Sequence, residues 1–131
     1  MIALDTNVLV RYFAQDDRDQ TTAALKLMDS LTPEKPGFIS LVVLAELVWV
    51  LDFSLQVARS EIATTLETVL RSKELVIQHA EVAAQALRKF KDNNCDYADC
   101  LIERGAHIAG SDYVVTFDRK AAKGTGMKLL A

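Results

Sequence analysis

Four acidic residues occur where the sequence is otherwise apolar. Asp5 follows the stretch "IAL", and Glu46 is the only charged residue of the run "ISLVVLAELVWVL". Asp99 lies in "DYADCLI", and Asp118 follows "YVVTF". Carboxylates brought to one point repel each other strongly unless a cation neutralises them, and their hard oxygen atoms suit Mg²⁺ or Mn²⁺. These acids are therefore our candidates for a metal-binding site.

Glu46 is the strongest single signal, because an ionised carboxylate is costly to remove from water without a partner. If the run forms a helix, Glu46 faces four positions, none of them basic: Val42, Val43, Trp49 and Val50. A partner must then come from elsewhere in the chain or from a bound ion. The alternative is a helix with one solvated edge, but that edge would also expose large apolar side chains. We therefore favour a functional role for Glu46.

Asp5 lies at the end of a predicted strand, where open parallel sheets place their ligands. Asp, Thr and Asn are all good N-caps, so the segment "DTN" also fits the start of a helix. Thr6 and Asn7 could cap that helix and leave Asp5 free for a site. On its own, Asp5 fits a structural role and a functional role equally well.

Two acids compete for one role in the segment "NNCDYADCLIERGAHIAG". Asp96 fits the N-cap of a helix and Asp99 fits an acid in its first turn, as in a capping box. Asp99 also borders a predicted apolar stripe, so it could point into a pocket instead. The stripe consists of Ala98, Leu101, Ile102, Gly105, Ile108 and Ala109.

Asp118 precedes the basic segment "RKAAK" and also fits a helix N-cap. Thr116 and Asp118 lie near the carboxyl end of a predicted strand at residues 113–117. If this strand is a neighbour of the first strand, both residues lie beside Asp5. Taken together, the acids at strand ends are stronger evidence for a functional site than any one of them alone.

These acids need a scaffold of strands and helices to hold them. We predict strands at residues 2–4, 38–40, 75–77, 113–117 and 128–130. We predict a first helix carrying Val8, Leu9, Tyr12 and Phe13, and further helices near 17–31, 41–52, 57–72, 79–92 and 97–109. Strands that alternate with helices indicate an α/β sandwich with a mainly parallel sheet.

The length and composition fit one domain. The 131 residues, 50% of them apolar, can bury a sizeable core, and we predict a single domain over residues 1–131. The net charge of −3 argues against nucleic-acid binding by bulk charge alone, but residues 85–131 hold 8 Lys or Arg against 6 Asp or Glu. A local basic surface beside an acidic pocket is therefore compatible with the sequence.

The sequence gives no sign of export or of a membrane span. Its start lacks the basic region of a targeting signal, and the apolar run at 39–51 is too short to cross a bilayer, so we expect a cytoplasmic protein. Cys95 and Cys100 show neither metal-ligand spacing nor a disulfide framework. We interpret both as thiols in the core or at its edge.

Four segments, in this order along the chain, resemble the PIN-domain ribonucleases: "LDTNVLVRY", "LVVLAELVWVL", "DYADCLI" and "VVTFDRKAAK". The resemblance covers essentially the whole chain, and within that family it is greatest to the VapC toxins of type II toxin–antitoxin systems. It implies a compact three-layer α/β/α PIN domain with a mainly parallel central sheet. It also implies one or two Mg²⁺ or Mn²⁺ ions held by Asp5, Glu46, Asp99 and Asp118. Asp96 is an alternative third ligand, and Thr6 and Thr116 are expected to support the ligands through their hydroxyl groups.

The resemblance further implies an endoribonuclease that hydrolyses structured RNA, such as tRNA or ribosomal RNA. A metal held by carboxylates lowers the pKa of a bound water, positions it for in-line attack on a phosphodiester and stabilises the leaving oxygen. Arg11 and the basic residues of the last third would contact flanking phosphates, although each also fits an ordinary solvated charge.

The same resemblance implies protein partners. A homodimer is usual in this family, and a small VapB-type antitoxin silences the toxin by placing its carboxyl-terminal segment in the active groove. Candidates for contact with the antitoxin are Tyr12, Phe13, Trp49 and Phe53. For any single one of these side chains, a place in the core is the simpler interpretation.

Two other classes of protein remain open at this point. One is a different Mg²⁺-dependent phosphotransfer domain with an acid at the end of its first strand. A haloacid-dehalogenase-like phosphatase needs a second Asp two residues after the first, where this chain has Asn7. A receiver domain needs a pair of acids before its first helix and an acceptor Asp on a middle strand. A non-catalytic RNA- or protein-binding module with this fold is the other alternative, and an intact set of four acids argues against it.

Overall fold

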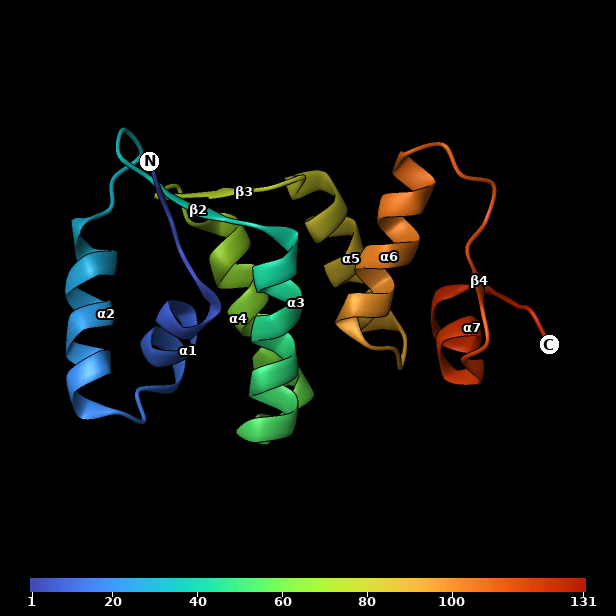
Figure 1. The fold of residues 1–131 in the computed structure, drawn as a ribbon, viewed down its shortest axis with the longest axis horizontal. Coiled ribbons are helices and arrows are strands. Elements are labelled where there is room, and N and C mark those ends of the chain that lie inside the picture. The colour runs from blue at the N-terminus through green and yellow to red at the C-terminus, as the bar shows by residue number, and fades with distance from the viewer. The chain divides into compact units, whose positions relative to one another are not determined.

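The computed structural model of the chain describes residues 1–131 and divides them into two compact units. Unit 1 comprises residues 1–78 and unit 2 comprises residues 79–131. None of the helices is both long and apolar enough to cross a membrane. Each unit contains its own helices and its own parallel sheet (Figure 1).

Unit 1 is built around a three-stranded parallel sheet in the order β1-β2-β3. In this sheet, Ile2 pairs with Gly37, and Gly37 pairs with Leu75. The elements of the unit are β1 (Ile2–Ala3), α1 (Thr6–Ala14), α2 (Arg18–Ser30), β2 (Gly37–Ile39), α3 (Leu41–Trp49), a π-helical turn η1 (Val50–Ser54), α4 (Arg59–Arg71) and β3 (Leu75–Ile77). The carboxyl ends of β1 and β2 lead directly into α1 and α3, which therefore begin at the same edge of the sheet.

The core of unit 1 is aliphatic. Helix α1 packs against both α2 and α3, and side chains from several elements are fully buried there. They include Leu9, Ile39, Leu44, Leu47, Ile62 and Leu66. Leu44 and Leu47 lie three positions apart on α3, so one stripe of this helix is buried and the opposite edge is solvated.

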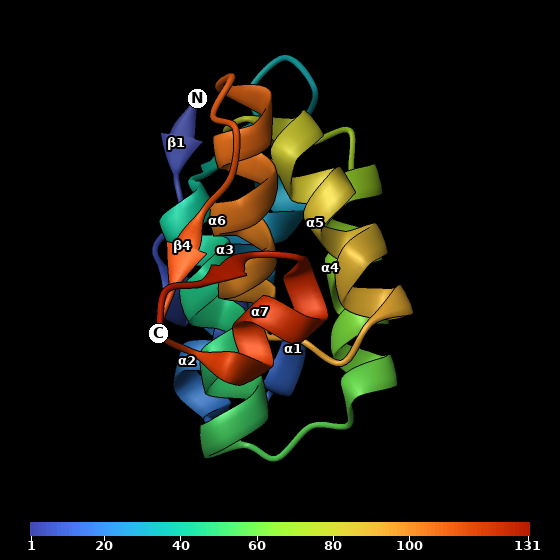
Figure 2. The same cartoon turned by 90° about the vertical axis from the view of Figure 1, so that its right-hand side faces the viewer.

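Unit 2 consists of two packed helices followed by a small parallel sheet and a short helix. Its elements are α5 (Ala80–Asp92), α6 (Tyr97–Ile108), β4 (Val115–Thr116), α7 (Arg119–Thr125) and β5 (Lys128–Leu129). Helices α5 and α6 lie side by side (Figure 2). The Tyr97 ring, fully buried, meets the edge of Phe90 at a centroid distance of 5.8 Å, and its hydroxyl donates to the Ala83 carbonyl over 3.0 Å. Burial raises the pKa of Tyr97, so this hydroxyl keeps its proton.

The buried face of α6 differs from the predicted stripe. Tyr97, Cys100 and Leu101 are buried, whereas Ala98 and Ile102 are exposed. The large aromatic ring of Tyr97 packs against α5, and this packing sets the rotation of α6 about its axis. The prediction was wrong because it weighted the aliphatic residues and omitted the aromatic residue and the thiol.

The last two strands are shorter than predicted and pair with each other. Strand β4 covers two residues of the predicted 113–117 strand and pairs with β5 in a sheet separate from β1-β2-β3. Tyr113, Val115 and Phe117 are all exposed. The run "YVVTF" is therefore the edge of a small sheet and is not a buried central strand.

A glycine in α7 allows close packing inside unit 2. A Cβ atom at Gly124 would lie 2.7 Å from the Cβ atom of Cys95 and 3.0 Å from the main-chain oxygen of Asn94. Any side chain at this position would therefore collide with the connection between α5 and α6. The lack of a side chain at Gly124 lets α7 approach this connection.

Candidate functional site

Asp5 is the N-cap of α1. Its backbone is extended, with φ −81° and ψ 162°, and its carboxylate accepts a hydrogen bond from the Thr6 amide over 2.8 Å. The expectation that Thr6 or Asn7 would cap this helix in its place was wrong, because the Thr6 hydroxyl has another partner. Asp5 is nevertheless exposed at the carboxyl end of β1, so capping does not remove it from solvent.

The partner of the Thr6 hydroxyl is Glu46. The Thr6 hydroxyl donates to Glu46 Oε1 over 2.9 Å, and the two residues are 40 positions apart in sequence. The expectation that a partner for Glu46 must come from elsewhere in the chain is confirmed for this contact. Thr6 is buried, so its hydroxyl is held in place and fixes one oxygen of the carboxylate. Asp5 and Glu46 are thus both bonded to the same residue, one to its amide and one to its hydroxyl.

Glu46 lies on the solvated edge of α3. It is exposed, and so are Val42 and Trp49 on the same edge, whereas Val43 is buried. The alternative that we disfavoured from the sequence, a helix with one solvated edge that also exposes large apolar side chains, is therefore the arrangement observed. Trp49 and Phe53 are 59% and 68% exposed and stack on each other with centroids 5.4 Å apart. These two rings do not lie in the core, while Tyr12 and Phe13 are half-buried and in edge contact with each other.

In unit 2, two acids act on the carboxyl group of Asp99. Burial raises the pKa of the Asp99 carboxyl, and the charges of Asp96 and Asp118 raise it further. Lys120 acts in the opposite direction. Asp99 is half-buried, whereas Asp96 and Asp118 are exposed. The negative charges of Asp96 and Asp118 disfavour the ionised form of Asp99. A bound cation would offset this repulsion.

Asp96 and Asp118 occupy equivalent places at helix starts but bond differently. Asp118 caps α7, and its carboxylate accepts from the Ala121 amide over 3.0 Å. Asp96 is the N-cap residue of α6 by position, yet its side chain makes no capping hydrogen bond. It lies 4.0 Å from Lys120 Nζ instead. The capping box predicted for Asp96 and Asp99 is therefore not formed through the Asp96 side chain.

Thr116 supports Asp118 through the backbone. Its hydroxyl oxygen accepts a hydrogen bond from the Asp118 amide over 3.0 Å. Thr6 and Thr116 thus each contact one of the candidate acids, Thr6 through the Glu46 carboxylate and Thr116 through the Asp118 main chain.

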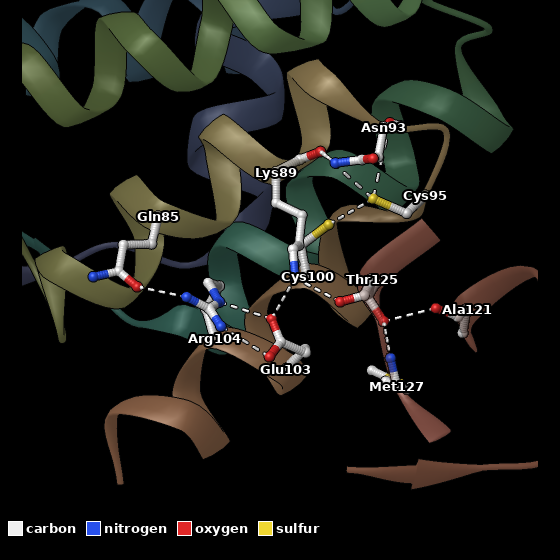
Figure 3. Close-up of polar contacts among 10 residues, drawn as sticks. All are labelled: Gln85, Lys89, Asn93, Cys95, Cys100, Glu103, Arg104, Ala121, Thr125 and Met127. Carbon is white, nitrogen blue, oxygen red and sulfur yellow. Dashed lines mark hydrogen bonds and ion pairs between the residues drawn. The ribbon is translucent and has the colours of Figure 1, made fainter. Parts of the chain in front are cut away.

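The sequence did not reveal a charged network that includes Glu103 and Arg104 of α6 (Figure 3). Glu103 binds Arg104 Nε and Lys89 Nζ, each over 2.7 Å, and Lys89 also donates to the Thr125 carbonyl. The hydrogen bond from Arg104 is the main cause that lowers the pKa of Glu103 to about 2, against the opposing effect of burial. The network ties α5, α6 and the end of α7 together. Lys89, Glu103 and Thr125 are far apart in sequence, and the network follows no motif.

Several basic residues proposed as phosphate contacts are already engaged. Arg11 donates to Gln20 and Asp16, and Lys89 and Arg104 belong to the network of Glu103. Exposed basic side chains also lie on α7, next to Asp118 in sequence: Arg119, Lys120, whose Nζ is 4.0 Å from Asp96, and Lys123. Helix α7 therefore carries exposed positive charge close to Asp118 in sequence.

The donor atoms of the candidate acids fit a hard divalent cation. All are carboxylate oxygens, and the mutual repulsion at Asp99 is of the kind that Mg²⁺ or Mn²⁺ would neutralise. The structure shows no group of three or more His, Cys, Asp or Glu side chains that could hold a metal ion. Unit 1 contributes Asp5 and Glu46 to the candidate set, and unit 2 contributes Asp99 and Asp118.

Comparison with known proteins identifies the family. The sequence profile of the PIN domain matches residues 2–125, which is nearly the whole chain. No curated protein sequence matches the chain at a significant level. The helices and parallel strands are consistent with a three-layer α/β/α fold, and the match leaves no place for a phosphatase-like or receiver-like assignment. The chain therefore belongs to the PIN-domain family, whose fold is of the nuclease type.

Proposed function

We propose that this PIN domain is a metal-dependent endoribonuclease that acts on structured RNA, and that it is the toxin of a VapBC-type toxin–antitoxin pair in the cytoplasm. The observation that carries the nuclease part is the half-buried Asp99, whose ionised form is disfavoured by burial and then by the charges of Asp96 and Asp118. Acids in such a setting are frequent at functional sites, and membership of a nuclease-type family gives this one a chemical role.

In this proposal Asp5, Glu46, Asp99 and Asp118 hold Mg²⁺ or Mn²⁺. When bound, the metal supplies an activated water and stabilises charge on the leaving oxygen of the phosphodiester. The chain's own residues fix the ligands. The Thr6 hydroxyl orients Glu46, the Thr6 amide orients Asp5, and the Ala121 amide orients Asp118. Asp96 is the alternative to Asp99 as the third ligand, and it is more exposed.

Exposed basic residues on α7 support binding of the RNA backbone. Arg119, Lys120 and Lys123 follow Asp118 in sequence, so a phosphate held by them would lie near this acid. Arg11 is a weaker candidate because its guanidinium is held by Gln20 and Asp16. Neutralising one exposed phosphate contact should weaken RNA binding and reduce its salt dependence.

The proposal includes a homodimer and a VapB-type antitoxin. Exposed apolar side chains on the solvated edge of α3 and η1, namely Val42, Trp49 and Phe53, support a protein contact on unit 1. Co-expression with the small reading frame beside the gene tests the antitoxin, and light scattering of the purified chain tests the dimer. A chain that is harmless to bacterial cells when expressed as soluble, active enzyme would argue for a housekeeping nuclease instead.

The nuclease is tested with purified protein and total RNA, with Mg²⁺, with Mn²⁺ and with a chelator. We expect discrete cuts only when a metal is present. Glu46→Gln and Asp99→Asn should abolish cleavage, whereas Glu34→Gln and Asp112→Asn, which change exposed acids outside the candidate set, should not. Cleavage that survives exhaustive chelation would refute the metal-dependent mechanism.

A further inference from the structure

The two cysteines of unit 2 bring their sulfur atoms together in the core. The Sγ atoms of Cys95 and Cys100 lie 2.9 Å apart (Figure 3), and the residues are 1% and 0% exposed. Neither residue takes part in a disulfide in this structure. At this distance the two thiols form a hydrogen bond in which either sulfur can be the donor, and a disulfide bond is about 2.0 Å long. A small movement would therefore bring the two sulfurs to bonding distance.

Packing alone accounts for only part of this arrangement. Cys95 precedes the N-cap Asp96, and Cys100 lies four positions after it, which is the spacing of a hydrophobic staple. A staple needs two apolar side chains and has no requirement for thiols. The Cys95 sulfur also faces two main-chain oxygens, those of Lys89 at 3.8 Å and Asn93 at 3.9 Å. The end of α5 thus holds this sulfur next to Cys100.

We propose that Cys95 and Cys100 are a modification site, at which a peroxide converts the two thiols into an intramolecular disulfide that a thiol reductant reverses. In the first step, the Cys95 sulfur attacks a peroxide oxygen, so that an S–O bond forms, the O–O bond breaks and water leaves. In the second step, the Cys100 sulfur attacks Cys95, so that the S–S bond forms, the S–O bond breaks and a second water leaves. Two thiols are oxidised and one hydrogen peroxide is reduced to two waters.

The structure assigns the order of these steps. Cys95 lies in the short connection between α5 and α6, with exposed residues on both sides of it: Asn93, Asn94 and Asp96. Cys100 lies within α6. Local opening of a connection costs less than unfolding of a packed helix, so peroxide reaches Cys95 first. The disulfide would close a small loop around Asp96 and Asp99 and would join the connection covalently to the start of α6.

The test uses the full chain and hydrogen peroxide, followed by alkylation of the remaining thiols under denaturing conditions. Trypsin cuts after Lys91 and Arg104, so both cysteines fall in the single peptide 92–104. We expect this peptide to escape alkylation and to weigh two hydrogens less than the reduced peptide. Treatment with a thiol reductant before alkylation should restore two alkylation sites. Hydrogen exchange at the start of α6 should be slower in the oxidised protein.

Single substitutions separate the role of Cys95, which reacts with the peroxide, from that of Cys100, which then attacks Cys95. In Cys100→Ser, oxidation should stop at a sulfenic acid on Cys95, which dimedone traps, whereas Cys95→Ser should leave Cys100 largely unmodified because it is buried. The wild-type mapping is informative even where a variant folds poorly. A peptide 92–104 that stays doubly alkylated, or that is linked only between two chains, would overturn the proposal. The site does not depend on the proposed nuclease, because neither readout measures cleavage.

Discussion

The candidate acids of the two units are held in different ways. In unit 1, Asp5 and Glu46 are exposed, and both bond to the same residue, Thr6. In unit 2, Asp99 is half-buried, and its pKa is raised by burial and by two neighbouring acids. Carboxylates that are proposed to serve one function therefore need not share one environment. Unit 1 supplies acids that hydrogen bonds orient, and unit 2 supplies acids whose repulsion favours a cation.

The largest expected effect is on cleavage. Glu46→Gln and Asp99→Asn should each lower the rate at least about 100-fold, because loss of a metal ligand removes several kcal/mol of transition-state stabilisation. High Mn²⁺ should restore more activity to Glu46→Gln, since this variant keeps all three acids of unit 2 that attract the cation. The measurement is cleavage rate against Mn²⁺ concentration. Equal rescue of both variants would show that the two environments make no difference to metal binding.

The next largest effect concerns stability and contrasts the ion pairs of the two units. Glu103→Gln should cost about 1–3 kcal/mol at neutral pH, because it leaves Lys89 and Arg104 half-buried without their carboxylate. Asp16→Asn removes the partner of Arg11 in a more exposed pair of unit 1 and should cost less than about 1 kcal/mol. Denaturant unfolding of both variants measures this difference.

The Glu103 effect should also depend on pH. The pKa of Glu103 is about 2 in the folded protein, below its ordinary value of 4.5. The stabilisation is therefore complete above pH 4.5 and is lost as the pH falls through about 2. The wild type and Glu103→Gln should accordingly converge in stability at the acid end. A gap that stays constant down to pH 2 would assign the loss to packing and not to charge.

Helix caps should give an effect of intermediate size. Asp118→Ala should destabilise the protein by about 1 kcal/mol, because Asp118 bonds the Ala121 amide. Asp96→Ala should cost only a few tenths, since the Asp96 side chain makes no capping bond. Thermal unfolding of the two variants compares them directly. Equal losses would mean that the charge of Asp96 also stabilises α6. This would be an interaction with the helix dipole and not a capping hydrogen bond.

The smallest effect is a gain. Asp99→Asn should raise stability at neutral pH by less than about 1 kcal/mol, because it removes a half-buried charge beside two acids. The folded pKa is raised, so the wild type is penalised as the pH rises above the ordinary value of 3.8, and the gain of the variant should vanish below it. Asp112→Asn, an exposed acid of the same unit, is the control. Glu46→Gln should leave stability unchanged, because Glu46 is exposed.

Local periodicity predicted most of the elements. The strand at 75–77 and the helix near 79–92 agree with β3 (Leu75–Ile77) and α5 (Ala80–Asp92) to within one residue. These segments have strong apolar patterns, and such patterns act over short distances. Strand pairing is not local, which is why the sequence could not show that β4 pairs with β5 in a separate sheet.

The sequence predicted which residues belong to the candidate site. It could not predict the burial of each residue or the charges around it. The sequence indicated that Glu46 needed a distant partner, and Thr6 fills this role for one of its oxygens. It could not indicate that Glu46 lies in solvent, because the burial of α3 depends on which neighbours cover its stripe. The pKa of Asp99 likewise depends on the charge of Asp118, which only the fold brings close to Asp99. Charge–charge effects of this kind have no local signature.

Gly124 limits how this sequence can diverge during evolution. At Gly105, an added methyl group would meet nothing nearer than Val82 at 3.7 Å, so drift to alanine is sterically free there. At Gly124 the obstacle includes the Asn94 main-chain oxygen, which no change of side chain removes. Replacing Cys95 by a smaller residue would therefore not release position 124. Among relatives that keep this packing, the glycine should persist even where the cysteines are lost, and the two features should be inherited independently.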